Sequence, residues 1–280
     1  MNQDNYIEKC FNGEVIYGDN FNIDEINKWF EMEKEGYSSL GTLELKDLNK
    51  NIYHYHQLNK LYGFKYIDSL KNFKNVLGIG SATGIEFDPI IDKIESLHIL
   101  EPSDILREKK IKILDIKYVE PTIEGVINFE NNKFDLITSF GVLHHIPNVS
   151  FVISEISRVL NNGGLFLFRE PIVSMGDWRK KRYGLTKNER GLPIKVLKKI
   201  ILENNFEIIA ENYCFTLTTP LNKIFIKFCK TPIYYYKTYL LFDKIISKLL
   251  RLNIKYHATN KYDKLYPQNV FFVLKKRNLD

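Results

Sequence analysis

The segment VLGIGSATGIE at residues 76–86 joins a short apolar run to the beginning of a helix. Its glycines Gly78, Gly80 and Gly84 permit tight turns and a close approach of the backbone to a ligand. The helix that follows offers unpaired N–H groups and the positive end of its dipole to that ligand. The third glycine comes four positions after the second, whereas the dinucleotide fingerprint has it three positions after. The loop therefore predicts a ligand site after a first strand and argues against a dinucleotide.

From residue 75 onward, short apolar runs alternate with longer mixed segments, which is typical of a parallel βαβ sheet. Strands are expected at 76–79, 97–100, 117–119, 134–139, 165–169, 206–211 and 270–274. Helices are expected at 23–35, 53–61, 151–160 and 194–203, and the NNGG turn at 161–164 should end the third of them. We expect a helical cap at 1–70 and a main domain at 71–280, which includes a basic loop at 172–192 and an insertion at 220–262.

The composition is typical of a globular protein with a substantial core, since 44% of the 280 residues are hydrophobic and 26% are charged. The net charge of +6 favours an anionic partner, although a general abundance of Lys explains it equally well. The three cysteines, Cys10, Cys214 and Cys229, form no CxxC pair, which argues against a metal site and suits a reducing compartment. No leader and no run of about 20 apolar residues is evident, so the sequence predicts a cytoplasmic protein.

Two further blocks follow the glycine loop at characteristic distances: FDLITSFGVLHHIPN at 134–148 and ISEISRVLNNGGLFLFREP at 153–171. Together with the loop, they resemble the motifs of class I methyltransferases, which use S-adenosylmethionine. In that family the loop reads as an acidic residue followed by G-x-G-x-G. Here Gly78 stands in place of the acidic residue and Ala82 replaces one glycine, which removes one usual contact to the amino-acid end of the donor.

The resemblance implies a Rossmann-like fold, in which a seven-stranded, mostly parallel sheet has helices on both faces and VFFVLKK at 270–276 is the antiparallel last strand. It also implies S-adenosylmethionine as the methyl donor, S-adenosylhomocysteine as the product and no metal. Glu101 would hold the ribose, since a carboxylate can accept two hydroxyl hydrogen bonds, although a solvated strand-end residue is the alternative. The other implied donor contacts are Gly78, Gly80, Ser81, Ala82, Gly84, Pro102, Thr122, Ile123, Ser139 and Gly141.

Three stretches outside this core add a second resemblance: EKEGYSSLG at 33–41, YHYHQLNKLYGF at 53–64 and SMGDWRKKRYGLTKNERGLP at 174–193. They resemble methyltransferases associated with bacterial surface-polysaccharide synthesis. This implies O-methylation of a small polar, sugar-like or phosphate-bearing acceptor, a carbohydrate precursor of a polysaccharide. The alternatives are C- or N-methylation of a lipid, quinone or amine, and a protein that binds S-adenosylmethionine without catalysis.

Candidate catalytic residues follow the fourth and fifth strands. His144 or His145 could take a proton from an acceptor hydroxyl near neutral pH, and a packing role is the alternative. Glu170 could bind an acceptor hydroxyl or assist the base, with a salt bridge to Arg169 as the alternative.

Candidate acceptor residues lie on both sides of the main domain. Arginine forks suit phosphate, so Arg179, Arg182 and Arg190 are expected to bind an anionic acceptor, with a solvated loop as the alternative. Tyr55 and His56 could belong to a lid or to the core. The Lys-rich, aromatic stretch 220–257 could cover the acceptor or lie on an anionic membrane, and no RNA-binding motif is recognised. The oligomeric state stays open.

Overall fold

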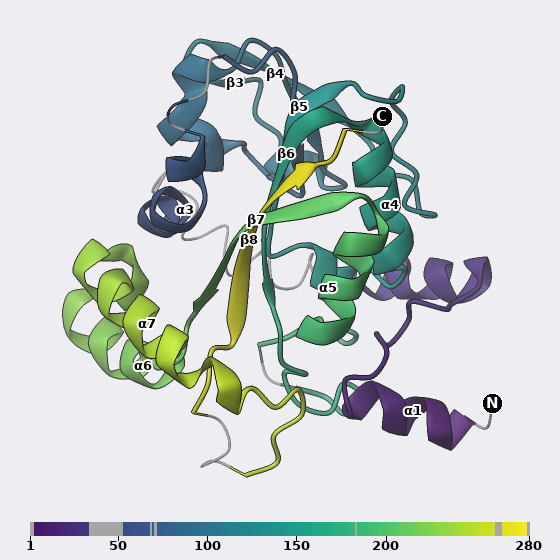
Figure 1. The fold of residues 1–280 in the computed structure, drawn as a ribbon, viewed down its shortest axis with the longest axis vertical. Helices are drawn as coiled ribbons and strands as arrows, with labels where there is room; N and C mark the ends of the chain where they lie inside the picture. The colour runs from purple at the N-terminus through teal and green to yellow at the C-terminus, as the bar shows by residue number, and fades with distance from the viewer. Residues whose placement is uncertain are drawn as a thin grey trace.

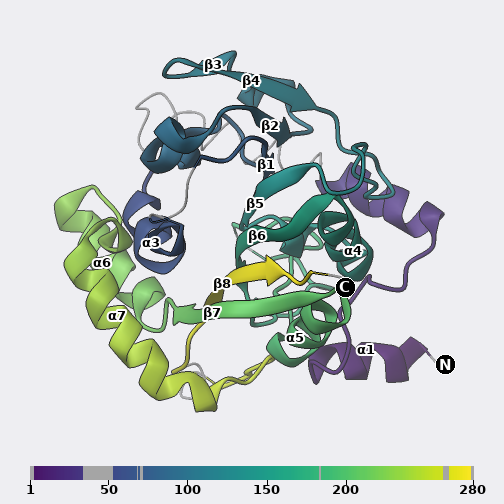
Figure 2. The same cartoon turned by 45° about the horizontal axis from the view of Figure 1, so that its top comes forward.

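The computed structural model describes residues 3–33, 53–67, 69, 72–182, 184–260 and 265–278. Within these ranges one eight-stranded sheet has the order β3-β4-β2-β1-β5-β6-β8-β7. Helices cover both of its faces, as Figures 1 and 2 show. The predicted Rossmann-like architecture is therefore confirmed.

The parallel part of the sheet has β1 at its centre, between β2 and β5. The parallel strands are β1 (Val76–Ile79), β2 (Leu97–Leu100), β4 (Leu114–Val119), β5 (Phe134–Phe140) and β6 (Leu160–Pro171). At one end, β8 (Asn269–Lys276) runs antiparallel between β6 and β7 (Phe206–Cys214), as expected for the last strand.

The sheet has one strand more than the seven expected. The extra strand, β3 (Lys110–Ile111), pairs antiparallel with β4 at the sheet edge. Lys112 has φ 51°, a left-handed conformation that closes the tight turn between the two strands. This hairpin also explains why β4 begins at Leu114, before the predicted start at Lys117.

The central strands are buried on both faces, and alternate side chains enter two separate cores. One core includes Phe166, Phe168 and Phe272 and is covered by α4 (Val149–Val159) and α5 (Ile194–Glu203). The other includes Leu167 and Phe271 and is covered by α3 (His56–Tyr62) and by the 3-10 helix η2 (Ile85–Lys93). Continuous apolar runs in β5 and β6 therefore follow from burial on both sides.

Two local features differ in detail from the prediction. The helix α4 ends at Val159, just before the NNGG stretch, as predicted, but this stretch is part of β6, and the ladder takes up the excess residues as a register shift between Phe134 and Leu136. The helix after the glycine loop is a 3-10 helix that contains Pro89, a residue without a backbone N–H to donate. Three further 3-10 turns lie before α4: η1 (Phe64–Tyr66), η3 (Asp104–Leu106) and η4 (Leu143–His145).

The described parts of the predicted cap lie on opposite faces of the sheet. Ile16, between α1 (Gln3–Phe11) and a helix at 23–33, belongs to the α4–α5 core, whereas Leu58 of α3 belongs to the other core. The expected end of the helix at Glu35 and most of the EKEGYSSLG stretch lie outside the described residues. The predicted domain boundaries stay predictions.

The predicted insertion between β7 and β8 is helical. It comprises α6 (Thr218–Cys229), η5 (Ile233–Tyr235), α7 (Lys237–Leu250) and η6 (Arg251–Asn253). Helices α6 and α7 lie side by side in both views, at the margin of the molecule (Figures 1 and 2). Among the described residues, none of the helices has the length and apolar character needed to cross a bilayer. The cytoplasmic location stays a prediction.

Candidate functional site

The glycine loop follows β1, at the edge of the sheet where the parallel strands end. Gly80 has φ 61°, and a Cβ there would come within 2.7 Å of the Val142 side chain, so only glycine fits between the two loops. Ala82 adopts a left-handed φ of 45° although it carries a side chain. The loop is therefore packed closely against the turn after β5, and its backbone faces the expected donor site.

A buried carboxylate lies beside the position where the motif lacks its acidic residue. The Ser81 hydroxyl donates to Glu86 Oε1 at 2.9 Å, and the Thr138 hydroxyl donates to the same oxygen at 2.7 Å. A Cβ at Gly78 would collide with the Ser81 hydroxyl, so this side chain and Glu86 take the space of a residue 78 side chain. Burial raises the pKa of Glu86 to about 7, although both hydroxyl hydrogen bonds lower it. The sequence prediction missed Glu86 because it lies outside the motif positions.

Glu101 is buried at the end of β2 and is bound to the glycine loop. Its carboxylate accepts hydrogen bonds from the N–H groups of Ala82 (3.2 Å) and Ser103 (3.0 Å), which flanks Pro102. Burial raises the pKa of Glu101, and the two backbone donors oppose this rise. Each carboxylate oxygen has a second lone pair, so the group can still accept ribose hydroxyls.

The predicted adenine contacts follow β4, the neighbour of β2. The Thr122 hydroxyl accepts from Val126 N–H at 2.8 Å and donates to Val126 O at 3.1 Å, which closes a turn. Ile123 in this turn is 38% exposed, so its apolar side chain is available to a flat ring. Thr122 and Ile123 therefore lie beyond the same sheet edge as Glu101.

Two buried polar groups at the ends of β5 and β6 lack hydrogen-bond partners within the described part of the chain. They are the Ser139 hydroxyl and Nη1 of Arg169, whose side chain is only 6% exposed. The guanidinium of Arg169 lies 4.1 Å from the centre of the Tyr55 ring, and its Nη2 would be 3.8 Å from a Cβ at Gly141. Unsatisfied buried donors are costly, so these groups indicate a polar ligand. The sequence prediction named Ser139 and Gly141 but not Arg169.

The predicted lid residues lie over the same region. The Tyr55 ring stacks on Tyr234 with ring centres 4.8 Å apart, and it also contacts Tyr53 and the guanidinium of Arg169. His56 contacts the Tyr53 ring at 4.9 Å, and burial lowers the pKa of His56. Tyr55 thus links the segment before α3 to β6 and to the helical insertion.

Glu170 is fully buried and holds the turn that carries both histidines. Its Oε1 accepts from the N–H groups of Val142 (3.0 Å) and Leu143 (2.9 Å), and its Oε2 lies 2.6 Å from His144 Nδ1. The alternative salt bridge with Arg169 is absent from the ion pairs of the described residues. The carboxylate of Glu170 is thus bound to the histidine turn and to His144, and its predicted acceptor contact stays a prediction.

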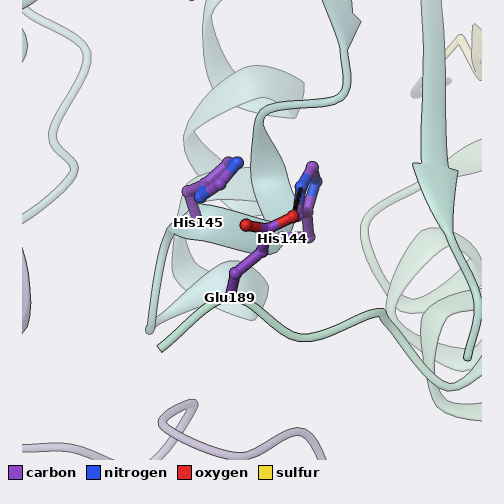
Figure 3. Close-up of side chains that lie close together, drawn as sticks. All are labelled: His144, His145 and Glu189. Atoms are coloured by element: carbon purple, nitrogen blue, oxygen red, sulfur yellow. Dashed lines mark ion pairs between the residues drawn. The ribbon is translucent and has the colours of Figure 1, made fainter. Parts of the chain in front are cut away.

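His144 lies between two carboxylates. Its Nε2 is 3.5 Å from Oε1 of Glu189, on the opposite side from Glu170, and Figure 3 shows this pair. Burial opposes the charged imidazole, but Glu170 and Glu189 together raise the pKa of His144 to about 9. A histidine that is protonated at neutral pH cannot accept a proton, so the geometry argues against His144 as the base.

His145 has the opposite character. Burial and the neighbouring charge of His144 lower the pKa of His145, while Glu33 opposes this, with Oε2 2.9 Å from His145 Nδ1. The backbone carbonyl of His145 accepts a hydrogen bond from Trp29 Nε1 at 2.6 Å. A neutral imidazole oriented by a carboxylate is the arrangement that a general base requires.

His144, His145 and Glu189 each bring one possible metal-ligand atom within 4.8 Å of the others. Figure 3 shows the three side chains converging. Each side chain also has a partner outside this cluster: Glu170 at Nδ1 of His144, Glu33 at Nδ1 of His145 and the Thr186 N–H at Oε2 of Glu189. With His144 protonated, its contact with Glu189 is an ion pair, and a protonated imidazole does not bind a metal.

The basic loop does not form the expected phosphate site. Arg190 is fully buried, and its guanidinium donates to four backbone carbonyls, those of Tyr17, His144, Ile146 and Pro147. This corrects the prediction for Arg190. Its guanidinium binds the backbone of the histidine turn. Arg179 pairs with Asp177 at 2.9 Å, and Arg182 donates to carbonyls within the loop, so the three arginines do not converge.

Comparison with known proteins identifies the central part of the chain. Residues 77–168 match a family model described as a methyltransferase domain. The chain is 26% identical over 145 residues to a ubiquinone biosynthesis O-methyltransferase of Nitrosomonas europaea. The aligned stretch covers 49% of this chain and 61% of that protein. The chain is also 29% identical over 144 residues to a ribosomal RNA small subunit methyltransferase G of Helicobacter acinonychis, covering 44% and 79% of the two chains.

Among solved structures, a methyltransferase from Archaeoglobus fulgidus that depends on S-adenosylmethionine shares the fold. It aligns with a TM-score of 0.51 and 16% identity, and the alignment covers 79% of this chain and 94% of that chain. This likeness concerns the fold. The family match begins within β1 and ends within β6. It therefore includes the glycine loop, Glu101 and the histidine turn.

Proposed function

The chain carries a class I, S-adenosylmethionine-dependent methyltransferase domain, and on this premise we propose that it methylates a hydroxyl group of a small polar, sugar-like or phosphate-bearing acceptor. The observation that carries the proposal is the His145–Glu33 pair at the end of β5, where a neutral imidazole is held by a carboxylate. A hydroxyl must lose its proton when it is methylated, and such a pair can accept that proton.

The residues at the sheet edge fit the donor. S-adenosylmethionine supplies an activated methyl group on a sulfonium, together with a ribose, a carboxylate and an ammonium group. Glu101 and the turn at Thr122 would hold its nucleoside, and the unpaired Arg169 would bind its carboxylate. Glu86 would bind the ammonium group in place of the acidic residue that the motif lacks. Methyl transfer then depends mainly on positioning.

The two histidines have different roles in this proposal. His145 takes the acceptor proton and Glu33 stabilises the resulting imidazolium, because the carboxylate already lies 2.9 Å from Nδ1. His144 stays protonated and, through Glu170, keeps the turn after β5 in place. His144 and Glu170 are therefore positioning residues.

A cavity of about 360 Å³ beyond the end of β6 supports a polar or anionic acceptor. Its lining includes Phe11, Ile172, Lys195, Lys255, Tyr256 and His257. Aromatic rings and ammonium groups together suit a sugar that carries phosphate or carboxylate. Ile172, which lines this cavity, follows Glu170 by two residues in the chain.

A second candidate is methylation of a quinone or another lipid. It is favoured by the similarity to a ubiquinone biosynthesis O-methyltransferase and by exposed apolar residues on α6 and α7. The similarity to a ribosomal RNA methyltransferase makes RNA a third acceptor to be tested, against our proposal that nucleic acid is not a partner.

Two measurements test these proposals. Calorimetry first establishes whether the donor site binds S-adenosylhomocysteine. Absence of binding would contradict all of these proposed functions. Radiolabelled methyl transfer into sugar nucleotides, short-chain quinols and ribosomal RNA, in parallel, then identifies the acceptor class. We expect label in the sugar nucleotides; label only in quinol or RNA would overturn the acceptor proposal, and binding without any transfer would favour a non-catalytic role.

A further inference from the structure

The helical hairpin of α6 and α7 exposes large apolar side chains. On α7 and the turn after it, Ile245, Leu249 and Leu252 are 62%, 69% and 89% exposed. On α6, Ile224 and Phe228 are 61% and 81% exposed. Single exposed apolar residues are common, but such a group on two adjacent helices indicates an interaction surface.

The inner face of α7 is mixed, because the apolar residues Tyr239 and Leu240 are buried together with the polar residues Asp243 and Ser247. Its polar residues Asp243 and Ser247 point inward, where Asp243 accepts from the N–H groups of Phe215 and Thr216. Its apolar residues Leu241, Phe242, Ile245 and Leu249 recur at helical spacing on the outer side. The hydrogen bonds of Asp243 fix this orientation, so exposure of the apolar stripe is built into the fold.

The charge of the hairpin has one sign. Between residues 218 and 256 the only acidic residue is Asp243, which is 1% exposed. The basic residues in this stretch are Lys223, Lys227, Lys230, Lys237, Lys244, Lys248, Arg251 and Lys255. All are exposed except the half-buried Lys244, so the outside of the hairpin combines apolar and cationic groups.

We propose that this hairpin surface docks on a membrane leaflet that contains anionic lipids. Ile224, Phe228, Ile245 and Leu249 would enter the headgroup region, and the flanking lysines would contact lipid phosphates. A basic amphipathic surface of this kind binds through buried apolar area together with attraction to anionic headgroups. The helices are too short to span, so they would lie in the plane of the interface.

Other occupants fit the surface less well. A second copy of the chain would bring two cationic surfaces together, which like charges oppose. RNA would satisfy the lysines, and bases could stack on Phe228, but the exposed aliphatic side chains Ile245 and Leu249 would have no partner in RNA. An anionic leaflet satisfies both the charge and the apolar groups.

Docking in this way would bring the candidate site close to the lipid surface. Tyr234, in the turn between α6 and α7, stacks on Tyr55, and Tyr55 contacts Arg169 at the end of β6. The hairpin is therefore connected through Tyr55 to the edge of the sheet that carries the site. The proposal does not depend on the acceptor class.

Cosedimentation of the full chain with vesicles tests the proposal. We expect binding to equimolar phosphatidylglycerol/phosphatidylcholine vesicles, weaker binding at high salt and little binding to phosphatidylcholine alone. The variant Ile245→Asp/Leu249→Asp should partition at least about tenfold less, because two side chains that would be buried become charged. Lys227→Glu/Lys248→Glu should also weaken binding.

The control is Ile105→Asp/Ile113→Asp, which places the same charges on exposed residues far along the sheet, where Ile105 and Ile113 are 77% and 91% exposed. It should bind vesicles like the wild type, and thermal unfolding should show that all variants fold. The proposal fails if the wild type does not sediment with anionic vesicles, or if the hairpin variant binds as well as the control. It also fails if the wild type instead forms a dimer, or an RNA complex without vesicle binding, that the hairpin substitutions disrupt.

Discussion

The Nδ1 atom of His144 lies 2.6 Å from Oε2 of Glu170, a carboxylate that is fully buried at the end of β6. The same carboxylate accepts hydrogen bonds from the backbone of Val142 and Leu143. Val142 in turn packs against Gly80 of the donor loop. One buried charge therefore connects β6, the histidine turn and the glycine loop.

Replacement of Glu170 by Gln should destabilise the fold strongly. The substitution leaves a buried, protonated imidazole with a weaker partner and removes charge from two backbone hydrogen bonds. Breaking a buried ion pair on one side costs about 3–5 kcal/mol. Urea unfolding followed by circular dichroism measures the loss. The matched control is Glu130→Gln in the exposed pair with Lys133, whose unfolding midpoint should be unchanged; equal midpoints for the two variants would contradict the role of Glu170.

The stability of the protein should depend on pH through His144. The pKa of His144 is raised to about 9 in the folded state, against about 6.5 in an unfolded chain. The stabilisation is therefore complete below pH of about 6.5 and is lost as the pH rises through about 9. The loss is on the order of 3 kcal/mol, from the difference in pKa.

The experiment is urea unfolding of the wild type and of His144→Asn at several pH values across that window. The difference in unfolding free energy between the two should shrink as the pH rises. Comparison with the variant cancels the contribution of Glu86. The pKa of Glu86 is raised to about 7, so the pH range over which Glu86 changes the stability ends where that of His144 begins. A difference that stays constant with pH would show that His144 is neutral in the folded protein.

The sequence predicted the positions of the central strands because buried parallel strands have continuous apolar runs with clear boundaries. It also placed the glycine loop, Glu101 and the histidines correctly at strand ends. It could not assign the partners of the histidines, because Glu33 and Glu189 are far from them in the sequence and meet them only through packing of the helix at 23–33 and the loop before α5.

Burial of charged groups was equally beyond the sequence. Arg190 stands in a basic loop that looks solvated, yet its guanidinium is enclosed by four carbonyls of separate segments. Conversely, α7 buries the polar residues Asp243 and Ser247 beside Tyr239 and Leu240, and Asp243 is held there by hydrogen bonds from the backbone after β7. In both cases hydrogen bonds between distant segments decide how the side chains are oriented, and the periodicity of the sequence does not reveal these bonds.

His145→Ala should lower kcat by about 10²–10⁴-fold while the Kd for S-adenosylhomocysteine stays near that of the wild type. The reason is that His145 is proposed to take the acceptor proton and does not belong to the proposed donor contacts. Steady-state kinetics and calorimetry separate the two effects. Near-wild-type kcat in His145→Ala would remove the proposed base.

Glu33→Gln gives a sharper readout of the same pair. Glu33 raises the pKa of His145, against burial and His144, which lower it. Without that carboxylate the pKa of His145 should fall further, so the acidic limb of the kcat profile should move to lower pH while kcat at its plateau decreases. Asp24→Asn, at an exposed residue of the same helix, serves as the control and should leave the profile unchanged. A profile that does not move in Glu33→Gln would mean that another group accepts the proton.

Glu86→Gln and Arg169→Gln should each weaken S-adenosylhomocysteine binding by about 10–100-fold, because each removes a buried charge proposed to pair with the amino-acid end of the donor. Isothermal calorimetry measures the change without any methyl transfer. Thr122→Ala, at the proposed adenine end, should have a smaller effect, since Thr122 only closes a turn.

The missing acidic residue of the motif allows the pairing of Glu86 to be tested by relocation of the charge. Gly78→Asp alone should bind poorly, since its side chain would collide with the Ser81 hydroxyl. The triple variant Gly78→Asp/Ser81→Gly/Glu86→Gln removes the collision with Ser81, although Phe87 Cε2 stays 3.0 Å from the new Cβ, and moves the carboxylate to the position that the family usually uses. It should recover a substantial part of the donor affinity that Glu86→Gln loses. Recovery would show that the two positions supply the same charge, whereas affinity no better than that of Glu86→Gln would mean that the buried Glu86 serves the loop and not the donor.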